Sequence, residues 1–303
     1  MTRPGKIISA LILAAVIAPV LLILSVYAGL FGHLQSREEL LRYENAKASV
    51  VLSLEGSPIG RFYAENRTLI TSGQIPDHIR DALIATEDAR FLEHSGVDTR
   101  SLFRVLLKSI LLNDRSSGGG STITQQLAKN MYGRENKGRL SIIIAKIREV
   151  LLAYRLEKAL TKEEILTLYL NTVPFGENIF GIEEASQRYF ARKTENLKPE
   201  ESAVLIGMLK ANTYYNPHLN PENARNRRNV VLKQMERYGY LAVSEADSLC
   251  KLPLVQHYSK SDDGGPADYF LVKVKEEAQD ILGEVNHVTE KKWNLEEDGL
   301  TIT

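Results

Sequence analysis

A run of 26 residues without a charge, from Ile7 to Gly32, constrains the fold of this chain more than any other feature. About 20 apolar residues in a helix cross a hydrocarbon core of about 30 Å, whereas the apolar part of a signal peptide has only about 7 to 15 residues. The run therefore predicts one transmembrane helix over residues 7–32. Arg3 and Lys6 precede it, so residues 1–6 are predicted to form a cytoplasmic tail, with the later chain outside the cytoplasm. A cleaved signal peptide is the alternative, but Val26-Tyr27-Ala28 matches an A-x-A cleavage site poorly.

The 303-residue chain otherwise has the composition of a globular protein, with 44% hydrophobic residues and 38 basic against 38 acidic residues. Its length suits one large domain or two smaller ones, each of about 100 to 200 residues. The formal net charge of zero argues against a histone-like protein, and no nucleic-acid partner is expected. Cys250 is the single cysteine, so neither an intrachain disulfide nor a cysteine-based metal cluster can form.

Hydrophobic periodicity predicts a mainly α body with one small β-hairpin. Residues 33–48 are rich in charge and are predicted to form a helical stalk. Two apolar runs, Ser49 to Leu54 and Ile59 to Tyr63, flank a Gly/Pro turn and predict the hairpin. Residues 262–266 predict a loop, and the final sequence DGLTIT predicts the start of a strand. The predicted helices cover residues 79–91, 101–112, 122–131, 140–160, 162–171, 181–190, 200–209, 226–239, 244–250 and 268–282.

Glu87 is a carboxylate in an apolar setting. It lies four residues after Leu83 and eight after Ile79, so a helix places all three on one face. A partly buried carboxylate can act as a general base near neutral pH. The alternative is a structural role, in which Glu87 caps the helix or pairs with Arg90 or His94.

Three glycines, Gly118 to Gly120, lead into the sequence STITQQ, in which Thr122 and Gln125 have the spacing of a capping box. A helix is therefore predicted to begin there, and its first amide groups and its dipole favour an anion. No Gly-Lys-Ser/Thr sequence follows, which excludes a nucleotide-binding P-loop. A flexible loop before an ordinary helix is the alternative.

The segment from Lys129 to Lys162 has nine basic and three acidic residues, a net charge of +6, whereas residues 261–303 have four basic and eleven acidic residues, a net charge of −7. Lys146 and Glu149 lie three residues apart in the basic segment and share a helix face. A phosphate-bearing substrate would account for the basic segment, and anionic lipid headgroups would account for it equally well.

Five motifs follow one another along the chain: ATEDARFLEHSGVD (85–98), GGSTITQQLAKN (119–130), KIREVLLAYRLE (146–157), KEEILTLYLN (162–171) and RYFARK (188–193). Their sequences and order resemble the peptidoglycan glycosyltransferases, which occur in class A penicillin-binding proteins and in monofunctional transglycosylases. The resemblance covers residues 45–240 and implies a lysozyme-like glycosyltransferase domain over residues 49–240. Residues 241–303 resemble the linker to a transpeptidase domain, so we expect the N-terminal piece of a bifunctional enzyme. A complete protein with an acidic tail is the alternative.

The resemblance implies polymerisation of lipid II into β-1,4-linked glycan strands at the outer face of the cytoplasmic membrane, with inversion at the anomeric carbon and release of undecaprenyl pyrophosphate. Glu87 would deprotonate the acceptor's 4-hydroxyl, and Glu149 would assist departure of the pyrophosphate, directly or through a metal ion. Lys146 and Arg148 would balance the pyrophosphate charge. The other substrate-binding residues that the first two motifs imply are Asp88, Phe91, His94, Ser121, Thr122, Gln125, Gln126 and Lys129.

The implied partners are lipid II, the growing lipid-linked glycan chain, the membrane bilayer and proteins of cell-wall synthesis or division. A divalent cation, Mg²⁺ or Mn²⁺, is the implied cofactor, without assigned ligands, and no organic cofactor is expected. Two positions depart from the family pattern: Ala145 replaces an arginine of the third motif and Thr167 replaces a glutamate of the fourth. Arg139 or Arg148 would then supply the missing phosphate contact. These departures leave a non-catalytic lipid II-binding scaffold as one alternative. A lysozyme-like glycan hydrolase, which would also use a glutamate on a helix, is the other.

Overall fold

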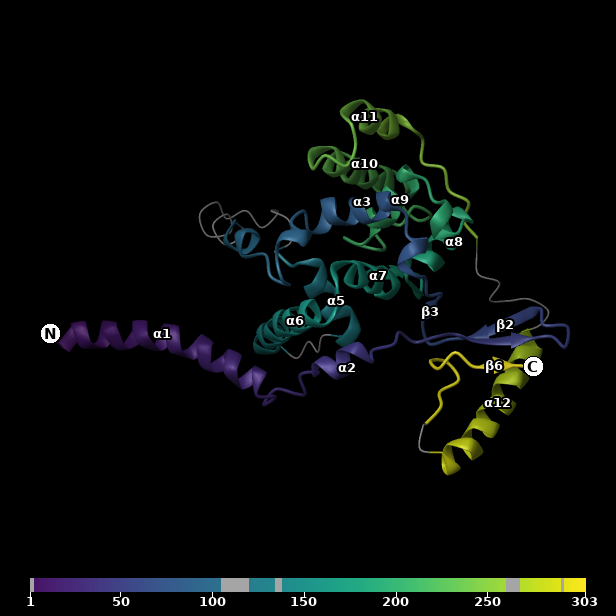
Figure 1. The fold of residues 1–303 in the computed structure, drawn as a ribbon, viewed down its shortest axis with the longest axis horizontal. Coiled ribbons are helices and arrows are strands. Elements are labelled where there is room, and N and C mark those ends of the chain that lie inside the picture. The colour runs from purple at the N-terminus through teal and green to yellow at the C-terminus, as the bar shows by residue number, and fades with distance from the viewer. Residues whose placement is uncertain (1–2, 105–119, 134–137, 260–267, 290–291) are drawn as a thin grey trace. The chain divides into compact units, whose positions relative to one another are not determined.

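The computed structural model describes the chain except residues 1–2, 105–119, 134–137, 260–267 and 290–291 (Figure 1). Contacts within the chain divide it into two compact units. The first unit consists of Met1–Tyr43 and Leu92–Ile165, and the second of Glu44–Phe91 and Leu166–Thr303. Each unit therefore combines two segments that are distant in the sequence.

The first unit is built on α6 (Arg139–Ala159), against which α1 (Arg3–Tyr27), α2 (Arg37–Leu41) and α5 (Ile123–Tyr132) pack. The fully buried apolar residues of α5 and α6 are Ile123, Leu127, Ala128, Leu152, Ala153 and Leu156. Their burial holds the first turn of α5 against α6, which matters for the site described below. α7 (Lys162–Thr172) carries the chain from the first unit into the second.

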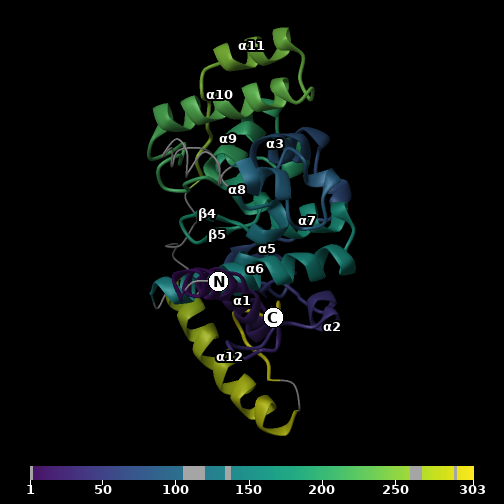
Figure 2. The same ribbon diagram turned by 90° about the vertical axis from the view of Figure 1, so that its left-hand side faces the viewer.

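The second unit is mainly helical and has α9 (Pro199–Met208) at its centre, because every residue of α9 from Glu201 to Met208 is buried. α3 (Asp77–Glu87) and α10 (Pro221–Arg237) pack on α9 and on each other, and α11 (Val243–Lys251) packs on α10. Figures 1 and 2 both show α10 between α11 and the α3–α9 pair. Two further helices, α8 (Ile182–Phe190) and α12 (Asp268–Val288), follow α7. The short 3₁₀ turns are η1 (Ser72–Gln74), η2 (Phe91–Glu93) and η3 (Thr194–Asn196).

Two small sheets belong to the second unit. The first has the order β2-β1-β6: β1 (Ser49–Leu52) pairs antiparallel with β2 (Pro58–Phe62) and parallel with β6 (Thr301–Ile302). Val51, Phe62 and Leu295 form its buried core, and apolar residues of α12 pack against them. The second sheet has the order β3-β5-β4, with strands β3 (Asn66–Arg67), β4 (Pro174–Gly176) and β5 (Ile179–Phe180).

The mainly α character, the hairpin and the C-terminal strand are confirmed. The predicted helical stalk is wrong, because residues 33–48 contain only the five-residue α2. The Ser36 and Glu39 capping box starts this helix, but so short a helix has little stability of its own. The helix predicted for 79–91 ends at Glu87, and the 101–112 helix is described only over residues 99–104. α10 begins five residues before the predicted start, because Pro221 fits the first helical position, and α12 continues six residues beyond the predicted end. The second sheet was not predicted.

Within the part of the chain that the structure describes, no helix combines the length and the apolar character that crossing a membrane requires. The transmembrane helix over residues 7–32 therefore stays a prediction.

Arg228 on α10 is 1% exposed and holds the C-terminal end of α11. Its guanidinium donates to the carbonyl oxygens of Cys250 at 3.2 Å, Leu252 at 2.8 Å and Pro253 at 3.3 Å. Burial lowers the pKa of Arg228 below its ordinary value. These bonds satisfy carbonyl groups that the end of a helix leaves without partners.

Replacing Arg228 with methionine is expected to lower the free energy of unfolding by about 2 to 4 kcal/mol, because it removes charge-assisted hydrogen bonds from buried carbonyl groups while keeping apolar volume. Denaturant unfolding followed by circular dichroism measures the change. Arg225→Met, an exposed arginine of the same helix, is the control and should change the free energy by less than about 0.5 kcal/mol. Equal losses in the two variants would contradict the role of Arg228.

Candidate active site

The first unit brings together one cation and three polar partners from the predicted site. Lys146 Nζ donates to Ser121 Oγ at 2.7 Å, to Gln125 Oε1 at 2.8 Å and to Glu149 Oε2 at 3.1 Å. Glu149 and Gln125 are buried, with 5% and 1% exposure. Three acceptors therefore fix the ammonium group, and one of them is a carboxylate, which is the strongest kind of acceptor for it.

The start of α5 has the predicted cap. The side chain of Thr122 accepts a hydrogen bond from the backbone N–H of Gln125 at 3.2 Å, and its hydroxyl donates to the carbonyl oxygen of Gly96 at 2.7 Å. Gln125 Nε2 donates to the same carbonyl at 3.1 Å. Gly96 has φ +84°, and a Cβ there would lie 2.9 Å from the backbone of Ala153, so only glycine fits between the α5 start and α6.

A second ion pair, in which the Glu157 carboxylate is buried, also contacts α5. Lys162 Nζ lies 2.7 Å from Glu157 Oε2, and Thr124 Oγ1 donates to Glu157 Oε1 at 2.6 Å. Lys162 also donates to the carbonyl oxygen of His94 at 2.6 Å. These contacts join α5, α6, the start of α7 and the loop that carries the first motif.

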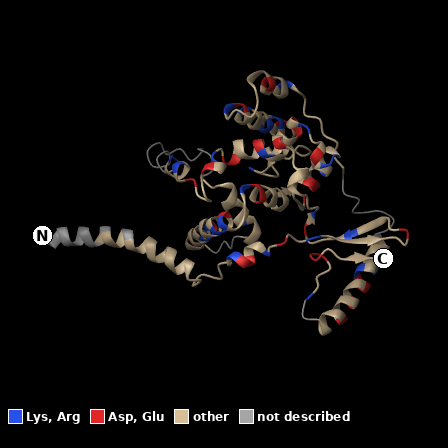
Figure 3. Cartoon of the chain, viewed as in Figure 1, with Lys and Arg blue, Asp and Glu red and all other residues tan. Residues whose placement is uncertain are grey.

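Other predicted site residues of the first unit lie outside the Lys146 cluster. Gln126 is half-buried and Lys129 is exposed on α5. Arg148 donates through Nη2 to the carbonyl oxygen of His33 at 2.7 Å, and thus contacts the segment that follows α1. The side chain of Arg139 lies outside the described part of the structure. Figure 3 shows that lysines and arginines recur along α6, so the predicted basic segment is largely this helix.

The second unit holds the remaining first-motif residues. Glu87 is the last residue of α3 and is half-buried, and Asp88 caps the helix with its backbone N–H bonded to Ile84 at 3.1 Å. Ile79 and Leu83, on the face of α3 that leads to Glu87, are fully buried, as predicted. Phe91 is also fully buried. Burial and the negative charge of Glu87 raise the pKa of Tyr169, a fully buried residue of α7, well above its ordinary value of 10.0.

α7 is also tied to the segment that precedes α3. The Asn171 side chain accepts from the backbone N–H of Ile70 at 3.1 Å and donates to the Ile70 carbonyl at 2.8 Å. Asn171 closes the fourth motif, and its paired bonds act on the chain only a few residues before α3. The fourth motif therefore contributes Tyr169, which interacts with Glu87, and Asn171, which binds the segment before α3.

The fifth motif organises the small β4–β5 turn. Glu177 and Asn178 have φ values of 53° and 57°, which is the backbone of a two-residue turn with both residues left-handed. Tyr189 is fully buried, and its hydroxyl donates to the carbonyl oxygen of Phe175 at 3.3 Å. Asn216 Nδ2 donates to Glu177 Oε1 at 2.8 Å. We interpret the fifth motif as a structural element of the second unit.

The residues around Glu149 do not fit a divalent cation. Among the described residues no group of three or more His, Cys, Asp or Glu side chains could hold a metal ion. Glu149 Oε2 lies 3.1 Å from the ammonium of Lys146, whereas hard cations such as Mg²⁺ prefer several oxygen ligands.

Sequence reasoning missed four residues that shape the site: Gly96, Glu157, Lys162 and Tyr169. All four stand inside the first, third and fourth motifs, so the motifs contained the signal. The reason for glycine at position 96 is visible only once the fold places Ala153 beside it.

Comparison with known proteins gives a consistent family assignment. The family model described as Transglycosylase matches residues 55–236. Penicillin-binding protein 1F of Bacillus subtilis is 33% identical over 270 residues, 86% of this chain and 37% of that protein. Penicillin-binding protein 1A of Haemophilus influenzae is 35% identical over 271 residues, 89% of this chain and 30% of that protein. Penicillin-binding protein 1A of Escherichia coli is 37% identical over 234 residues, 77% of this chain and 27% of that protein.

This chain thus spans about a third of the length of these relatives. A crystal structure of penicillin-binding protein 1A from Haemophilus influenzae aligns with 80% of this chain and 26% of its own, at a TM-score of 0.46 and 22% identity. The match of the family model to more than half of the residues, together with relatives above 30% identity, shows the family. The chain therefore belongs to the transglycosylase family of peptidoglycan glycosyltransferases, the kind of domain found in class A penicillin-binding proteins.

Proposed function

We propose that this chain polymerises lipid II into β-1,4-linked glycan strands, with inversion at the anomeric carbon and release of undecaprenyl pyrophosphate, on a lysozyme-like glycosyltransferase domain. The observation that carries the proposal is the Lys146 ammonium, fixed by Ser121, Gln125 and Glu149 at the first turn of α5. A fixed cation at the positive end of a helix suits a pyrophosphate, whose negative charge grows as the glycosidic phosphate bond breaks.

In this mechanism Glu87 accepts the proton of the acceptor's 4-hydroxyl. The hydroxyl oxygen then forms a bond to the anomeric carbon of the donor chain, and the bond from that carbon to the pyrophosphate oxygen breaks. Lys146 stabilises the charge that the pyrophosphate acquires. Glu149 contacts the ammonium of Lys146 and helps to fix its position, so it acts on the leaving group through Lys146.

We propose in addition that α1 anchors the chain in the cytoplasmic membrane as a single pass, with its N-terminus inside and the rest of the chain on the outer face. Large apolar side chains of α1 are exposed, including Leu11 at 65%, Leu21 at 57% and Leu24 at 55%. The described side chains of α1 include no Lys, Arg, Asp or Glu (Figure 3). A bilayer would remove these apolar surfaces from water. The anchor would hold the protein beside a substrate whose lipid tail stays in the same bilayer.

The proposed activity is tested by incubating the full chain with labelled lipid II in lipid vesicles and separating the products by gel electrophoresis. We expect long glycan strands that a muramidase digests to disaccharide units. Cleavage of preformed glycan without new polymer would instead identify a hydrolase. A chain that binds lipid II and forms no polymer would identify the scaffold that Ala145 and Thr167 leave as an alternative.

A further inference from the structure

The segment between α1 and α2 turns sharply and then runs along α6. Gly29 and Gly32 have φ values of 80° and 107°, which side-chain-bearing residues rarely adopt, and they let the chain turn after the end of α1. A Cβ on Gly32 would lie 3.0 Å from Nη1 of Arg148. The backbone of residues 31–35 therefore lies close enough to α6 for side chains of that helix to reach its carbonyl groups.

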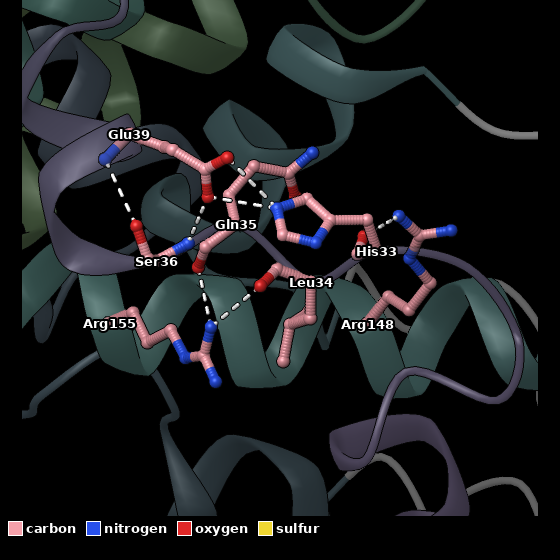
Figure 4. A network of polar contacts seen from close by, with 7 residues as sticks. All are labelled: His33, Leu34, Gln35, Ser36, Glu39, Arg148 and Arg155. Carbon is pink, nitrogen blue, oxygen red and sulfur yellow. Dashed lines mark hydrogen bonds and ion pairs between the residues drawn. The ribbon is translucent and has the colours of Figure 1, made fainter.

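Two arginines of α6 bind four of these carbonyl groups, and Figure 4 shows the contacts to His33, Leu34 and Gln35. Arg148 donates to the carbonyl oxygens of Phe31 at 3.4 Å and His33 at 2.7 Å. Arg155 Nη1 donates to the carbonyl oxygens of Leu34 at 2.9 Å and Gln35 at 2.5 Å. The arginines are seven residues apart, about two helical turns, so they share one face of α6. We call these two arginines and the four carbonyl groups the arginine latch.

Neighbouring contacts hold both ends of the latched segment. On the α1 side, the guanidinium of Arg155 lies 5.4 Å from the ring centre of Tyr27. On the α2 side, Ser36 and Glu39 form a capping box, and the ring of His33 lies 2.9 Å from a carboxylate oxygen of Glu39. The backbone N–H of Ser36 and the His33 side chain lower the pKa of Glu39 to about 2. The latch is thus one part of a continuous set of contacts from α1 to α2.

The same helix carries the cationic part of the candidate site. Lys146 and Glu149 lie on α6, close to Arg148 in the sequence. Glu149 follows Arg148 directly, so the two side chains point in directions about 100° apart around the helix. Glu149 is buried in contact with Lys146, whereas Arg148 points to the segment after α1. α6 therefore presents its site residues on one face and its latch residues on another. Because α6 is a rigid helix, the position of its latch residues also fixes the position of its site residues.

We propose that Arg155, together with Arg148, is a positioning residue that fixes the catalytic helix α6 at a set height relative to the membrane end of α1. This inference rests on the proposed polymerase function. A substrate with its tail in the bilayer presents its pyrophosphate at a nearly constant depth, so the height of Lys146 above the bilayer decides whether the two meet. Arg148, which the motif resemblance assigned to the pyrophosphate, has a positional role in this arrangement.

The test compares Arg155→Ala with the wild-type full chain on two substrates, lipid II in lipid vesicles and a water-soluble lipid II analogue with a short prenyl chain. We expect polymerisation in vesicles to fall about tenfold, because a small misplacement of catalytic groups is costly, and polymerisation of the soluble analogue to stay within about twofold. Amide hydrogen exchange over residues 28–43 should become faster in the variant. The vesicle activity of Arg155→Lys should fall between those of the wild type and Arg155→Ala, because an ammonium lacks the fork of donors that reaches two carbonyls.

Lys158→Ala is the matched control, since Lys158 is an exposed cation of the same helix that lies over the Tyr154 ring. It should leave both rates and the exchange unchanged. Gly32→Ala disturbs the latch from the other side and should reproduce the vesicle-specific loss without altering α6. Equal losses on the two substrates, or unchanged exchange over residues 28–43, would overturn the positional role. A wild-type chain that makes no polymer would overturn the proposed function instead, and the exchange measurement would still report on the latch.

Discussion

Glu87→Gln is expected to lower the rate of lipid II polymerisation by about 10² to 10⁴-fold, the range that a positioned general base contributes. Glutamine has nearly the same size and shape but cannot accept the proton of the acceptor's 4-hydroxyl. The loss should appear in kcat, because the base acts in the transition state and contributes little to binding of the ground state. Initial rates with labelled lipid II, over a range of concentrations, give kcat and KM separately.

The fold should tolerate this change. Glu87 is the last residue of α3, and the helix is held in the second unit by the buried side chains of Ile79 and Leu83. Its negative charge raises the pKa of the buried Tyr169, whose hydroxyl is neutral at working pH, so a neutral amide introduces no charge conflict. We therefore expect the melting temperature of the variant to stay within a few degrees of the wild type, which separates lost chemistry from lost structure.

Asp77→Asn is the matched control for Glu87→Gln. Asp77 is a carboxylate at the opposite end of α3, its side chain is 90% exposed, and it pairs with Arg80 at 2.6 Å. The same carboxylate-to-amide change there should leave the rate within about twofold, because exposed ion pairs contribute little. If Glu87→Gln kept most of the wild-type rate, Glu87 would be the structural carboxylate that its apolar setting equally allowed, and another group would have to be the base.

Elements decided by neighbouring residues could be predicted from the sequence. Thr122 and Gln125 are three residues apart, and the predicted bond from the Gln125 backbone N–H to the Thr122 side chain is present, although the Gln125 side chain binds Gly96 and Lys146 and does not complete the capping box. Lys146 and Glu149 are likewise three residues apart on one helix, and their contact at 3.1 Å was implied by that spacing. The hairpin of β1 and β2 followed from two apolar runs around a turn. In each case the interacting groups belong to one helix turn or one hairpin.

Elements decided by distant residues could not be predicted. The pairing of β1 with β6 joins Val50 to Thr301, and no local pattern identifies such a partner. The very short strands of the second sheet have too few residues to show a period of two. The charged segment 33–48 suggested a stalk, but the carbonyl groups of His33, Leu34 and Gln35 are bound by Arg148 and Arg155 of α6. From the sequence alone, a charged side chain on a helix is predicted to be exposed to solvent. Only the fold shows which backbone carbonyl group it binds.

Lys146→Met is expected to lower kcat by about 10² to 10³-fold, the cost of removing one fixed group that stabilises charge developing in a transition state. Methionine keeps most of the apolar length of lysine and removes the ammonium that contacts Ser121, Gln125 and Glu149. KM should change less than kcat, because the charge on the pyrophosphate is greatest as the bond breaks. The same initial-rate assay measures both constants.

Two further variants decide how Lys146 acts. Lys158→Met makes the same substitution at an exposed position of the same helix and should leave kcat within about twofold. Lys146→Arg keeps the positive charge, but a planar guanidinium cannot reproduce the contacts that a compact ammonium makes with three acceptors, so we expect partial activity. A Lys146→Arg variant as inactive as Lys146→Met would show that geometry outweighs charge. Wild-type kcat in Lys146→Met would mean that the leaving pyrophosphate is stabilised elsewhere, and the Lys146 cluster would then be a structural link between α5 and α6.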